Sequence, residues 1–561
     1  MAARRAEDAD LVDEALLGSC MDVPRADRHA WVETLAMRYE GVRRAAGEGG
    51  GGRKTGAWFT GPREVGLILD RAIPAALGAR WTACDPSCGT GHVLAGAAER
   101  LRARGWTGTR IARALHGMDV DPMSVAIARV RMAVRFGGSL AAWRRAIRVG
   151  DALAEGAWPG ARFDAVIGNP PFLGQLSARS ARTSAERRAR RDRFGGAVAR
   201  YADESAAFLL LGTELAPGGR VVLVQPCSVL AAADAQAVRD ACMASHALHE
   251  VCLLPARAFG AAVRTCILSL RAGRTPRVTA CDEAGRRRRV PARRLRGGRW
   301  GAALASVRGV PDNGVIAAGA TLGSMAEFDA DFRQHYYGLR GRVHEAGADV
   351  LRPGDRMLVT SGSIGPAMNT WGERPTRIHG TDVRRPIVRV AELAPDPVMG
   401  PWLTARSGPK VLVAMQTGVP EAWVDSDGRA LPSVPVVSVR PTAAGRMGPW
   451  KIGAAIMSPW VAAEAWWRHG GSGMSPGALR LAARDLAAMP APADRRAWER
   501  GARALRAWHG RPTSAAARRA FAEAMCDAHR VPHGVRRRAL VEWWEAAVVR
   551  AVHGTVDPQS M

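Results

Sequence analysis

The sequence contains very little lysine, no closely paired cysteine motif and no long apolar segment. Lysine occurs only at Lys54, Lys410 and Lys451, and the nine cysteines include no CxxC pair, so neither a disulfide framework nor a redox pair is expected. No run of about 18 apolar residues exists, which excludes a transmembrane helix. Residues 1–10 are charged and lack the apolar core of a secretory signal, so a cytoplasmic protein is expected.

Metal-binding side chains are also sparse. His529 and His533 have a spacing that suits one face of a helix, but Pro532 lies between them. Because this proline interrupts the helical spacing, no metal site is predicted.

The chain has a large excess of positive charge. Lysine and arginine together number 80 against 52 acidic residues, giving a formal net charge of +28. A GC-rich genome favours arginine codons, but it does not explain an excess of basic over acidic residues. The charge therefore indicates a polyanionic partner such as DNA or RNA.

The first half of the chain alternates between strand and helix patterns. This alternation predicts an α/β fold with a parallel, doubly wound sheet, and two final strands would complete seven near residue 272. The predicted strands are 81–84, 114–118, 146–149, 164–167, 220–225, 251–254 and 265–270, and the helices between them include 92–104, 122–136 and 203–215.

A chain of 561 residues is too long for one hydrophobic core, and its second half changes character. Short β-like runs separated by glycine, proline and tryptophan are followed by helical patterns. We therefore predict a mixed α+β domain and C-terminal helices. The expected parts are an N-terminal helical segment and glycine linker (1–52), a catalytic domain (53–272), a basic linker or hairpin (273–310), a DNA-binding domain (311–477) and a helical region (478–561).

The segment Asn169-Pro170-Pro171-Phe172 follows the apolar strand pattern of residues 163–168. The two prolines stiffen the turn and leave carbonyl groups as hydrogen-bond acceptors. Asn169 adds a side-chain carbonyl, and Phe172 offers an aromatic face for a planar ring. This combination suits a flat base with an exocyclic amine, although a proline-rich turn that merely ends a strand has the same pattern.

A glycine turn and two further carboxylates follow the earlier strands. Asp85-Pro86-Ser87-Cys88-Gly89-Thr90-Gly91 comes after the first strand, Asp119 ends the second and Asp151 follows the third. Such a turn admits nucleotide-like ligands, and a carboxylate at the next strand end can accept from ribose hydroxyls. Taken singly, the turn is also compatible with phosphate or dinucleotide binding, and each carboxylate with a helix cap. Because the turn and the two carboxylates follow successive strands, their order favours a single ligand-binding crevice.

These motifs together resemble the gamma-type N6-adenine DNA methyltransferases, which use S-adenosylmethionine. The resemblance rests on residues 53–60, the glycine turn, Asp119, Asp151 and the proline tetrapeptide, in that order, and covers roughly residues 53–270. It implies a Rossmann-like, seven-stranded catalytic domain followed by a target-recognition domain. One departure is that Gly61 separates Thr60 from Pro62, where the family usually has Thr-Pro.

The resemblance also implies the roles of individual residues. Asn169 and the Pro170 carbonyl would bind the target amine, Pro171 would stiffen the turn and Phe172 would stack on the base. Thr60 and the adjoining backbone would contact the methionine part of the cofactor, and Asp85 and Gly89 would line its pocket. Asp119 would hold the ribose and Asp151 would accept from the adenine amine. The implied cofactor-binding residues are Thr60, Asp85, Pro86, Gly89, Gly91, Asp119, Asp151 and Asn169.

The implied reaction transfers a methyl group to adenine N6 in double-stranded DNA, in restriction-modification or phage defence, with partner subunits of such a system as further partners. N4-cytosine methylation, RNA or protein methylation, and a catalytically inactive DNA-binding relic remain alternatives. A fused nuclease is not expected, because only about 50 residues precede the catalytic region and no nuclease motif is evident.

Each of two arginine-rich segments has two possible interpretations. Residues 177–200 are either a solvated helix face or a loop that meets phosphates. Arg374, Arg377, Arg384 and Arg385 are either a solvated basic loop or groups that reach phosphates and base edges.

Overall fold

The computed structural model divides the chain into two compact units, residues 1–303 and 304–561. It describes residues 2–48, 60–172, 184–198, 203–255, 258–259, 264–274, 277–314, 319–331, 333–347, 351–442, 448–473 and 477–553. Most of the predicted segment 53–60 and the first part of the arginine-rich segment 177–200 therefore lie outside the described residues. None of the helices within these ranges is both long and apolar enough to cross a membrane.

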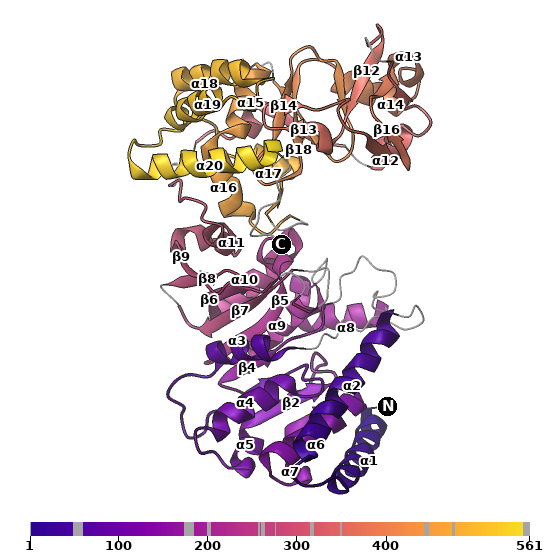
Figure 1. Ribbon diagram of the computed structural model, residues 1–561, viewed down its shortest axis with the longest axis vertical. Coiled ribbons are helices and arrows are strands. Elements are labelled where there is room, and N and C mark those ends of the chain that lie inside the picture. Colours follow the sequence, from indigo (N-terminus) through magenta and orange to yellow (C-terminus); the bar gives the residue numbers. More distant parts are fainter. Residues whose placement is uncertain are drawn as a thin grey trace. The chain divides into compact units, whose positions relative to one another are not determined.

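The first unit is built around one large sheet. Its strands run in the order β3-β2-β1-β4-β5-β7-β6-β8-β9 (Figure 1). Their bounds are β1 Ala83–Asp85, β2 Leu115–Asp119, β3 Ile147–Val149, β4 Ala165–Gly168, β5 Arg220–Pro226, β6 His246–Leu253, β7 Thr265–Ala272, β8 Val278–Cys281 and β9 Arg287–Val290.

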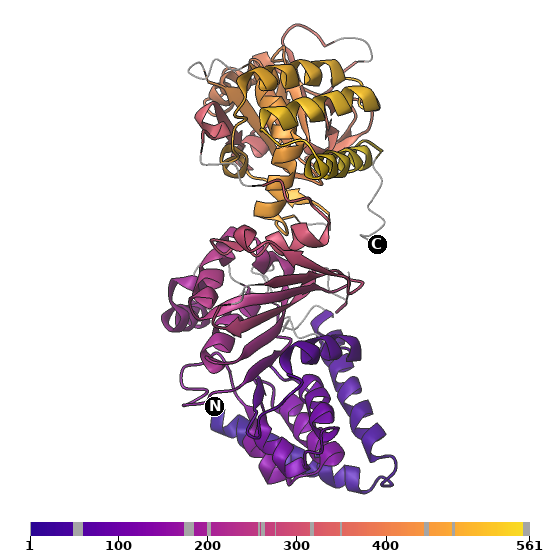
Figure 2. The same ribbon diagram turned by 90° about the vertical axis from the view of Figure 1, so that its left-hand side faces the viewer.

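This sheet confirms the predicted α/β fold. Strands β3, β2, β1, β4 and β5 are mutually parallel, and β7 enters antiparallel between β5 and β6. The expected seven strands are extended by β8 and β9, which pair antiparallel as a hairpin next to β6. This stretch, which the sequence predicts as a basic linker or hairpin, is a hairpin that extends the sheet. Figure 2 shows the twisted strands fanning out across the unit.

Helices cover both faces of the sheet. Their bounds are α1 Ala2–Met21, α2 Arg28–Glu48, α3 Pro62–Ala72, α4 His92–Arg102, α5 Gly108–Ala114, α6 Pro122–Phe136, α7 Leu140–Ala146, α8 Ser184–Phe194, α9 Glu204–Leu215 and α10 Gln236–Ser245. Helices α1 and α2 pack on α6, so the N-terminal segment is part of this unit (Figure 1).

The alternation of side chains along β4 explains why this strand is apolar throughout. Ala165 and Ile167 join the core cluster that contains residues of α3 and α4. Val166 lies on the other side, where a Cβ on Gly212 of α9 would approach it within 3.6 Å. Because both faces are covered, every residue of β4 is buried, as expected for a central parallel strand.

The second unit contains two four-stranded sheets. One has the order β10-β22-β18-β20 and the other β11-β17-β12-β21, and the described residues also form three two-stranded sheets. The strands are β10 Ala326–Ala330, β11 His344–Glu345, β12 Asp355–Val359, β13 Ile364–Gly365, β14 Met368–Asn369, β15 Thr376–Ile378, β16 Thr381–Val383, β17 Pro386–Arg389, β18 Lys410–Ala414, β19 Gln416–Thr417, β20 Ala422–Asp425, β21 Ala430–Pro432, β22 Val436–Pro441 and β23 Leu479–Arg480.

The helices of the second unit are concentrated toward its C-terminal end, where α18 and α19 lie side by side (Figures 1 and 2). Trp508, Phe521 and Trp544, contributed by α18, α19 and α20, have ring centroids 5.5–5.8 Å apart and form the aromatic centre of this helical part. The helices are α12 Arg333–Gly338, α13 Val390–Leu393, α14 Met399–Arg406, α15 Pro449–Met457, α16 Pro459–His469, α17 Ala483–Ala487, α18 Arg495–Trp508, α19 Ala515–Ala528 and α20 Val535–His553, and the short α11 Ala302–Val307 spans the boundary between the units.

One of the three lysines has a structural task in the second unit. Lys410 is fully buried, and its Nζ lies 2.6 Å from Oδ2 of Asp425 on the neighbouring strand. The same carboxylate accepts the backbone N–H groups of Arg429 and Ala430. Lys410 therefore belongs to a satisfied buried network and is not part of the surface charge available to DNA.

Candidate functional site

The predicted site residues follow adjacent parallel strands and meet at one edge of the first unit's sheet. Asp85 ends β1, Asp119 ends β2, Asp151 follows β3 and Asn169 follows β4. The strands are neighbours in the order β3-β2-β1-β4. Since the carboxyl ends of parallel strands lie at the same edge, the sheet brings these four residues together as predicted.

Asp119 connects three of the loops at this edge. Its carboxylate accepts the N–H of Gly89 at 2.9 Å and that of Asp121 at 3.0 Å. Its backbone carbonyl accepts the N–H of Gly150 at 2.8 Å. Burial raises the pKa of Asp119, and the two N–H groups oppose that rise. Asp119 thus holds the glycine turn, its own loop and the end of β3 in one arrangement.

The glycines of the turn have specific backbone requirements. Gly89 and Gly91 have φ angles of 52° and 83°, in the left-handed region that favours glycine. A Cβ on Gly91 would approach the Cβ of Ala128 on α6 within 3.2 Å. The turn therefore lies tightly against α6 at the start of α4.

Asp85 and Asn169 are brought together by Gly168. Gly168 has a φ of 151°, and a Cβ there would lie 2.5 Å from Oδ1 of Asp85. The Asp85 carboxyl consequently packs directly against the backbone at the end of β4. Asn169, the next residue, donates its side-chain N–H to the hydroxyl of Thr60 at 3.1 Å. Thr60 is buried, although Gly61 separates it from Pro62 at the start of α3.

The environment of Asp85 is apolar and acidic. Burial raises the pKa of Asp85 to about 7, the nearby charge of Asp119 contributes to the rise, and the hydrogen bond from the Ser87 N–H opposes it. Pro86 is also buried beside it. A carboxyl group with this pKa is well suited to a ligand that carries positive charge, because such a ligand favours the ionised form.

Phe172 and Asp151 have partners that the sequence did not predict. The Phe172 ring is 8% exposed and lies edge to face against Phe259, with ring centroids 6.1 Å apart. Asp151 is exposed, and its Oδ2 is 2.7 Å from Nη2 of Arg190 on α8. Stacking on Phe172 and acceptance of an adenine amine by Asp151 therefore remain predictions about a ligand-bound arrangement.

The described part of the arginine-rich segment forms α8, and two of its arginines face the domain. Besides Arg190, Arg193 donates to the carbonyl of Ala154 and lies 3.4 Å from Oε2 of Glu214. Arg188 and Arg191 are exposed. Neither reading from the sequence describes this helix fully, because two of its arginines dock α8 onto the loop after β3 and two remain in solvent.

Helix α2 supplies a group of side chains that sequence reasoning missed. Glu40 accepts a short hydrogen bond from the Thr90 hydroxyl and lies 3.2 Å from Nε2 of His92. Tyr39 donates to Oδ2 of Asp121 at 2.8 Å, and Arg43 lies 3.1 Å from the same oxygen.

Through these contacts α2 holds both the glycine turn and the loop after Asp119. The sequence pattern showed α2 only as a helix. The spacing of Tyr39, Glu40 and Arg43, within four residues of one another, was the available signal.

The side chains at this edge contain no metal-binding cluster. Within the ranges that the structure describes, no group of three or more His, Cys, Asp or Glu side chains is arranged to hold a metal ion. His529 is buried in the second unit, where its ring stacks on Trp460 at a centroid distance of 5.0 Å.

The raised pKa of Asp85 predicts a pH-dependent stability. The neutral carboxyl is favoured in the folded protein, so this stabilisation is present at low pH and is lost as pH rises from about 4 through about 7. Asp85→Asn remains neutral at every pH, so its melting temperature relative to the wild type should rise between pH 5 and 8. The difference in the free energy of unfolding between the two proteins should change by roughly 1.4 kcal/mol per pH unit at most.

Thermal unfolding of both proteins across this pH range measures the effect. Asp192→Asn, at an exposed position on α8, is the matched control and should show a constant difference from the wild type. A constant difference for Asp85→Asn as well would contradict the prediction.

Comparison with known proteins gives a family match over part of the chain. Residues 33–290 match the family model described as N-6 DNA Methylase. A comparison with curated protein sequences gives no match. The match to the family model covers α2 and the whole sheet, including β8 and β9.

One of three similar solved structures supports a shared fold. The type IIL restriction-modification enzyme MmeI, solved in complex with DNA, aligns with a TM-score of 0.52 at 11% identity, covering 85% of this chain and 73% of MmeI. A modification subunit of a putative type I restriction enzyme from Vibrio vulnificus aligns at 18% identity and a TM-score of 0.35, over 45% of this chain and 52% of that one. A type I methyltransferase subunit from Streptococcus thermophilus aligns at 23% identity and a TM-score of 0.32, over 41% of this chain and 49% of that one.

The chain therefore spans about half the length of these two type I subunits. The similarity to MmeI extends over both units and shows that they share its fold. Methyl transfer in such domains uses S-adenosylmethionine as the donor. With the strand order, the glycine turn and the proline tetrapeptide in place, residues 33–290 of this chain match the family model described as N-6 DNA Methylase.

Proposed function

We propose that this chain transfers the methyl group of S-adenosylmethionine to the N6 amino group of adenine in double-stranded DNA, within a restriction-modification or phage-defence system. The observation that carries the proposal is the junction at Gly168, which sets Asn169 beside Asp85 at the carboxyl edge of the sheet. This junction makes the predicted base pocket and the predicted cofactor pocket neighbours.

The residues at the sheet edge fit the cofactor. Asp119 is half-buried and fixed by two N–H groups, so its carboxylate is already oriented to receive ribose hydroxyls. Asp85 lies where the cationic methionine part would favour its ionised form. Pro86, Gly89 and Gly91 form the wall of this pocket, and Thr60 lies beside it through Asn169. Bound S-adenosylmethionine supplies an electrophilic methyl group.

The chain's own residues contribute to the reaction by positioning the target amine. Adenine N6 is a weak nucleophile because its lone pair is delocalised into the ring. Hydrogen bonds from both amine protons to the Asn169 side chain and the Pro170 carbonyl favour a tetrahedral nitrogen with an available lone pair. The hydrogen bond from Asn169 to Thr60 fixes the amide so that its oxygen is the group directed at the target. In this proposal the Phe172 ring supports the face of the base.

A base within a duplex cannot reach a pocket at the sheet edge, so the proposal includes flipping of the target base, at a cost of a few kcal/mol. Exposed arginines around the β15–β16 hairpin of the second unit, at 374, 377 and 384, supply positive charge for phosphate or base contacts. The MmeI structure, which shares the fold of both units, was solved with DNA. These features support sequence-specific recognition by the second unit.

Methylation assays with labelled cofactor test the proposal. Incubation of the protein with double-stranded DNA, followed by mass spectrometry of the nucleosides, should give N6-methyladenine. N4-methylcytosine, or label that appears only in RNA or protein, would overturn the adenine assignment. The absence of transfer to any of these substrates would support a catalytically inactive DNA-binding relic.

Asn169→Ala tests the assigned role of the tetrapeptide. Loss of the amide removes an acceptor of the target amine, so methyl transfer should fall by at least about a hundredfold. Binding of S-adenosylmethionine and of duplex DNA should be nearly unchanged, because Asn169 contributes a single side chain to each surface. Transfer rates measured at saturating cofactor give the result, and wild-type activity of the variant would refute the role.

Glu40→Ala tests the contribution of α2 to the cofactor site. Without Glu40, Thr90 loses its carboxylate acceptor and the turn at residues 89–91 loses its link to α2. We expect binding of S-adenosylmethionine to weaken by about tenfold, or about 1.4 kcal/mol. Isothermal titration calorimetry measures the dissociation constant.

Arg38→Ala is the matched control, since Arg38 is exposed on the same helix. It should bind the cofactor like the wild type. A Glu40→Ala protein that binds S-adenosylmethionine with wild-type affinity would show that α2 does not support the cofactor site.

A further inference from the structure

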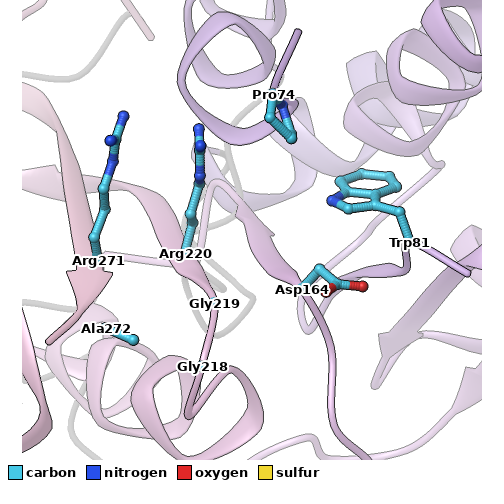
Figure 3. Close-up of a pocket in the computed structure, with 8 residues that line it drawn as sticks. All are labelled: Pro74, Trp81, Asp164, Gly218, Gly219, Arg220, Arg271 and Ala272. Atoms are coloured by element: carbon cyan, nitrogen blue, oxygen red, sulfur yellow. The ribbon is translucent and has the colours of Figure 1, made fainter. Parts of the chain in front are cut away.

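A cavity opens at the edge of the first unit's sheet that lies opposite the proposed methyl-transfer site. It has a volume of about 280 Å³ and is lined by Pro74, Trp81, Asp164, the Gly218-Gly219 turn, Arg220, Arg271 and Ala272 (Figure 3). These residues precede β1, β4 and β5 or end the antiparallel strand β7. The cavity is therefore at the amino ends of the parallel strands, whereas the methylation site is at their carboxyl ends.

Two arginines dominate this cavity. Arg220 and Arg271 are direct partners in the antiparallel register of β5 and β7. In Figure 3 their side chains extend side by side in the same direction. Like charges placed directly opposite each other on neighbouring strands destabilise a sheet. The pair is also half-buried, and burial together with the charge of Arg220 lowers the pKa of Arg271.

Carboxylates do not neutralise this pair. Among the residues that the structure describes, neither arginine forms an ion pair, and the buried Nε of Arg271 has no hydrogen-bond partner. Arg220 donates to the backbone carbonyl of Arg71 at 3.1 Å. Glu250, whose charge reaches Arg271, is already bound by Arg71 at 2.8 Å and by Arg287 at 3.0 Å.

His249 is a third basic group near the arginine pair. His249 lies at the bulge where the register between β6 and β7 shifts. Burial lowers the pKa of His249, and the charges of Arg271 and Arg220 lower it further. The imidazole is thus disfavoured as a cation by the same two guanidinium groups, which shows how concentrated the positive charge is at this point.

The remaining walls of the cavity suit an organic group. The Trp81 side chain is 6% exposed and faces Pro74, giving an apolar surface beside the arginines (Figure 3). Asp164 is exposed, and its Oδ2 accepts from the backbone N–H and the hydroxyl of Thr82. Its other oxygen can accept from a hydroxyl or amino group of a ligand.

We propose that this cavity binds a small phosphate-bearing anion, with the phosphate held between the guanidinium groups of Arg220 and Arg271 and the organic part against Trp81. Two neighbouring guanidinium groups provide the paired donors that phosphate oxygens accept. A bound dianion also removes the repulsion between the two arginines. The site is separate from the methyl-transfer centre and does not rest on the proposed methylation.

Thermal unfolding of the full chain tests this site, because the relative stability of the wild type and Arg271→Gln should differ between chloride and phosphate. The probes are inorganic phosphate and AMP, each compared with chloride at matched ionic strength. Both probes should raise the melting temperature of the wild type in a saturable way, and AMP should act at lower concentration because it also contacts Trp81. Arg271→Gln should be at least as stable as the wild type in chloride, because it removes the like-charge repulsion. In phosphate it should be the less stable protein, with an apparent dissociation constant at least about tenfold weaker.

Arg274→Gln is the control for charge, because Arg274 is exposed two residues beyond the end of β7. It should keep the response to both probes. A lower melting temperature of Arg271→Gln in chloride, with an unchanged response to phosphate, would show a purely structural role for Arg271 and overturn the proposal. So would a wild type that responds to phosphate no more than to chloride.

A short DNA duplex without adenine methylation sites distinguishes the source of the phosphate. Stabilisation by the small probes that is lost in Arg271→Gln supports the proposal. Stabilisation by the duplex alone, lost in Arg271→Gln, would instead assign the cavity to the nucleic-acid backbone and overturn the small-anion assignment.

Discussion

The first unit depends on the half-buried carboxylate of Asp119. The strand ends and turns at the edge of a parallel sheet could adopt many loop conformations. Asp119 restricts them, because its carboxylate accepts from the glycine turn and from its own loop, while its carbonyl accepts from the start of the loop after β3. A buried carboxylate is stable only when hydrogen bonds compensate for lost hydration. The requirement to satisfy Asp119 therefore fixes the geometry of three loops together, and the proposed methyl-transfer site is assembled around it.

The sequence predicted those parts of the site that follow from strand ends. Buried strands appear as short apolar runs, and the residue that follows each run is placed at the sheet edge by the parallel topology alone. This argument located Asp85, Asp119, Asp151 and Asn169. The two predicted features that carry special backbone geometry, the glycine turn and the prolines, were also readable because glycine and proline have distinct backbone preferences.

Contacts between distant elements could not be predicted in this way. Glu40 and Thr90 are 50 residues apart, and nothing in the local pattern of α2 shows which side chains face the glycine turn. The pairing of Arg190 with Asp151 has the same origin, because one charged residue among many arginines has no local signature. The hairpin β8–β9 was taken as a linker or exposed hairpin because its second strand is almost entirely arginine, and only its pairing with β8 places it in the sheet.

The contacts of α2 with the glycine turn and with Asp121 have a thermodynamic consequence. If Glu40, Tyr39 and Arg43 stabilise the conformation that binds S-adenosylmethionine, then linkage requires bound cofactor to stabilise the docking of α2 by the same free energy. The N-terminal helices would then be most firmly seated in the cofactor-loaded protein. Local opening of α2, and its susceptibility to proteolysis or hydrogen exchange, would report on the loading state of a site formed mainly by residues far from it in the sequence.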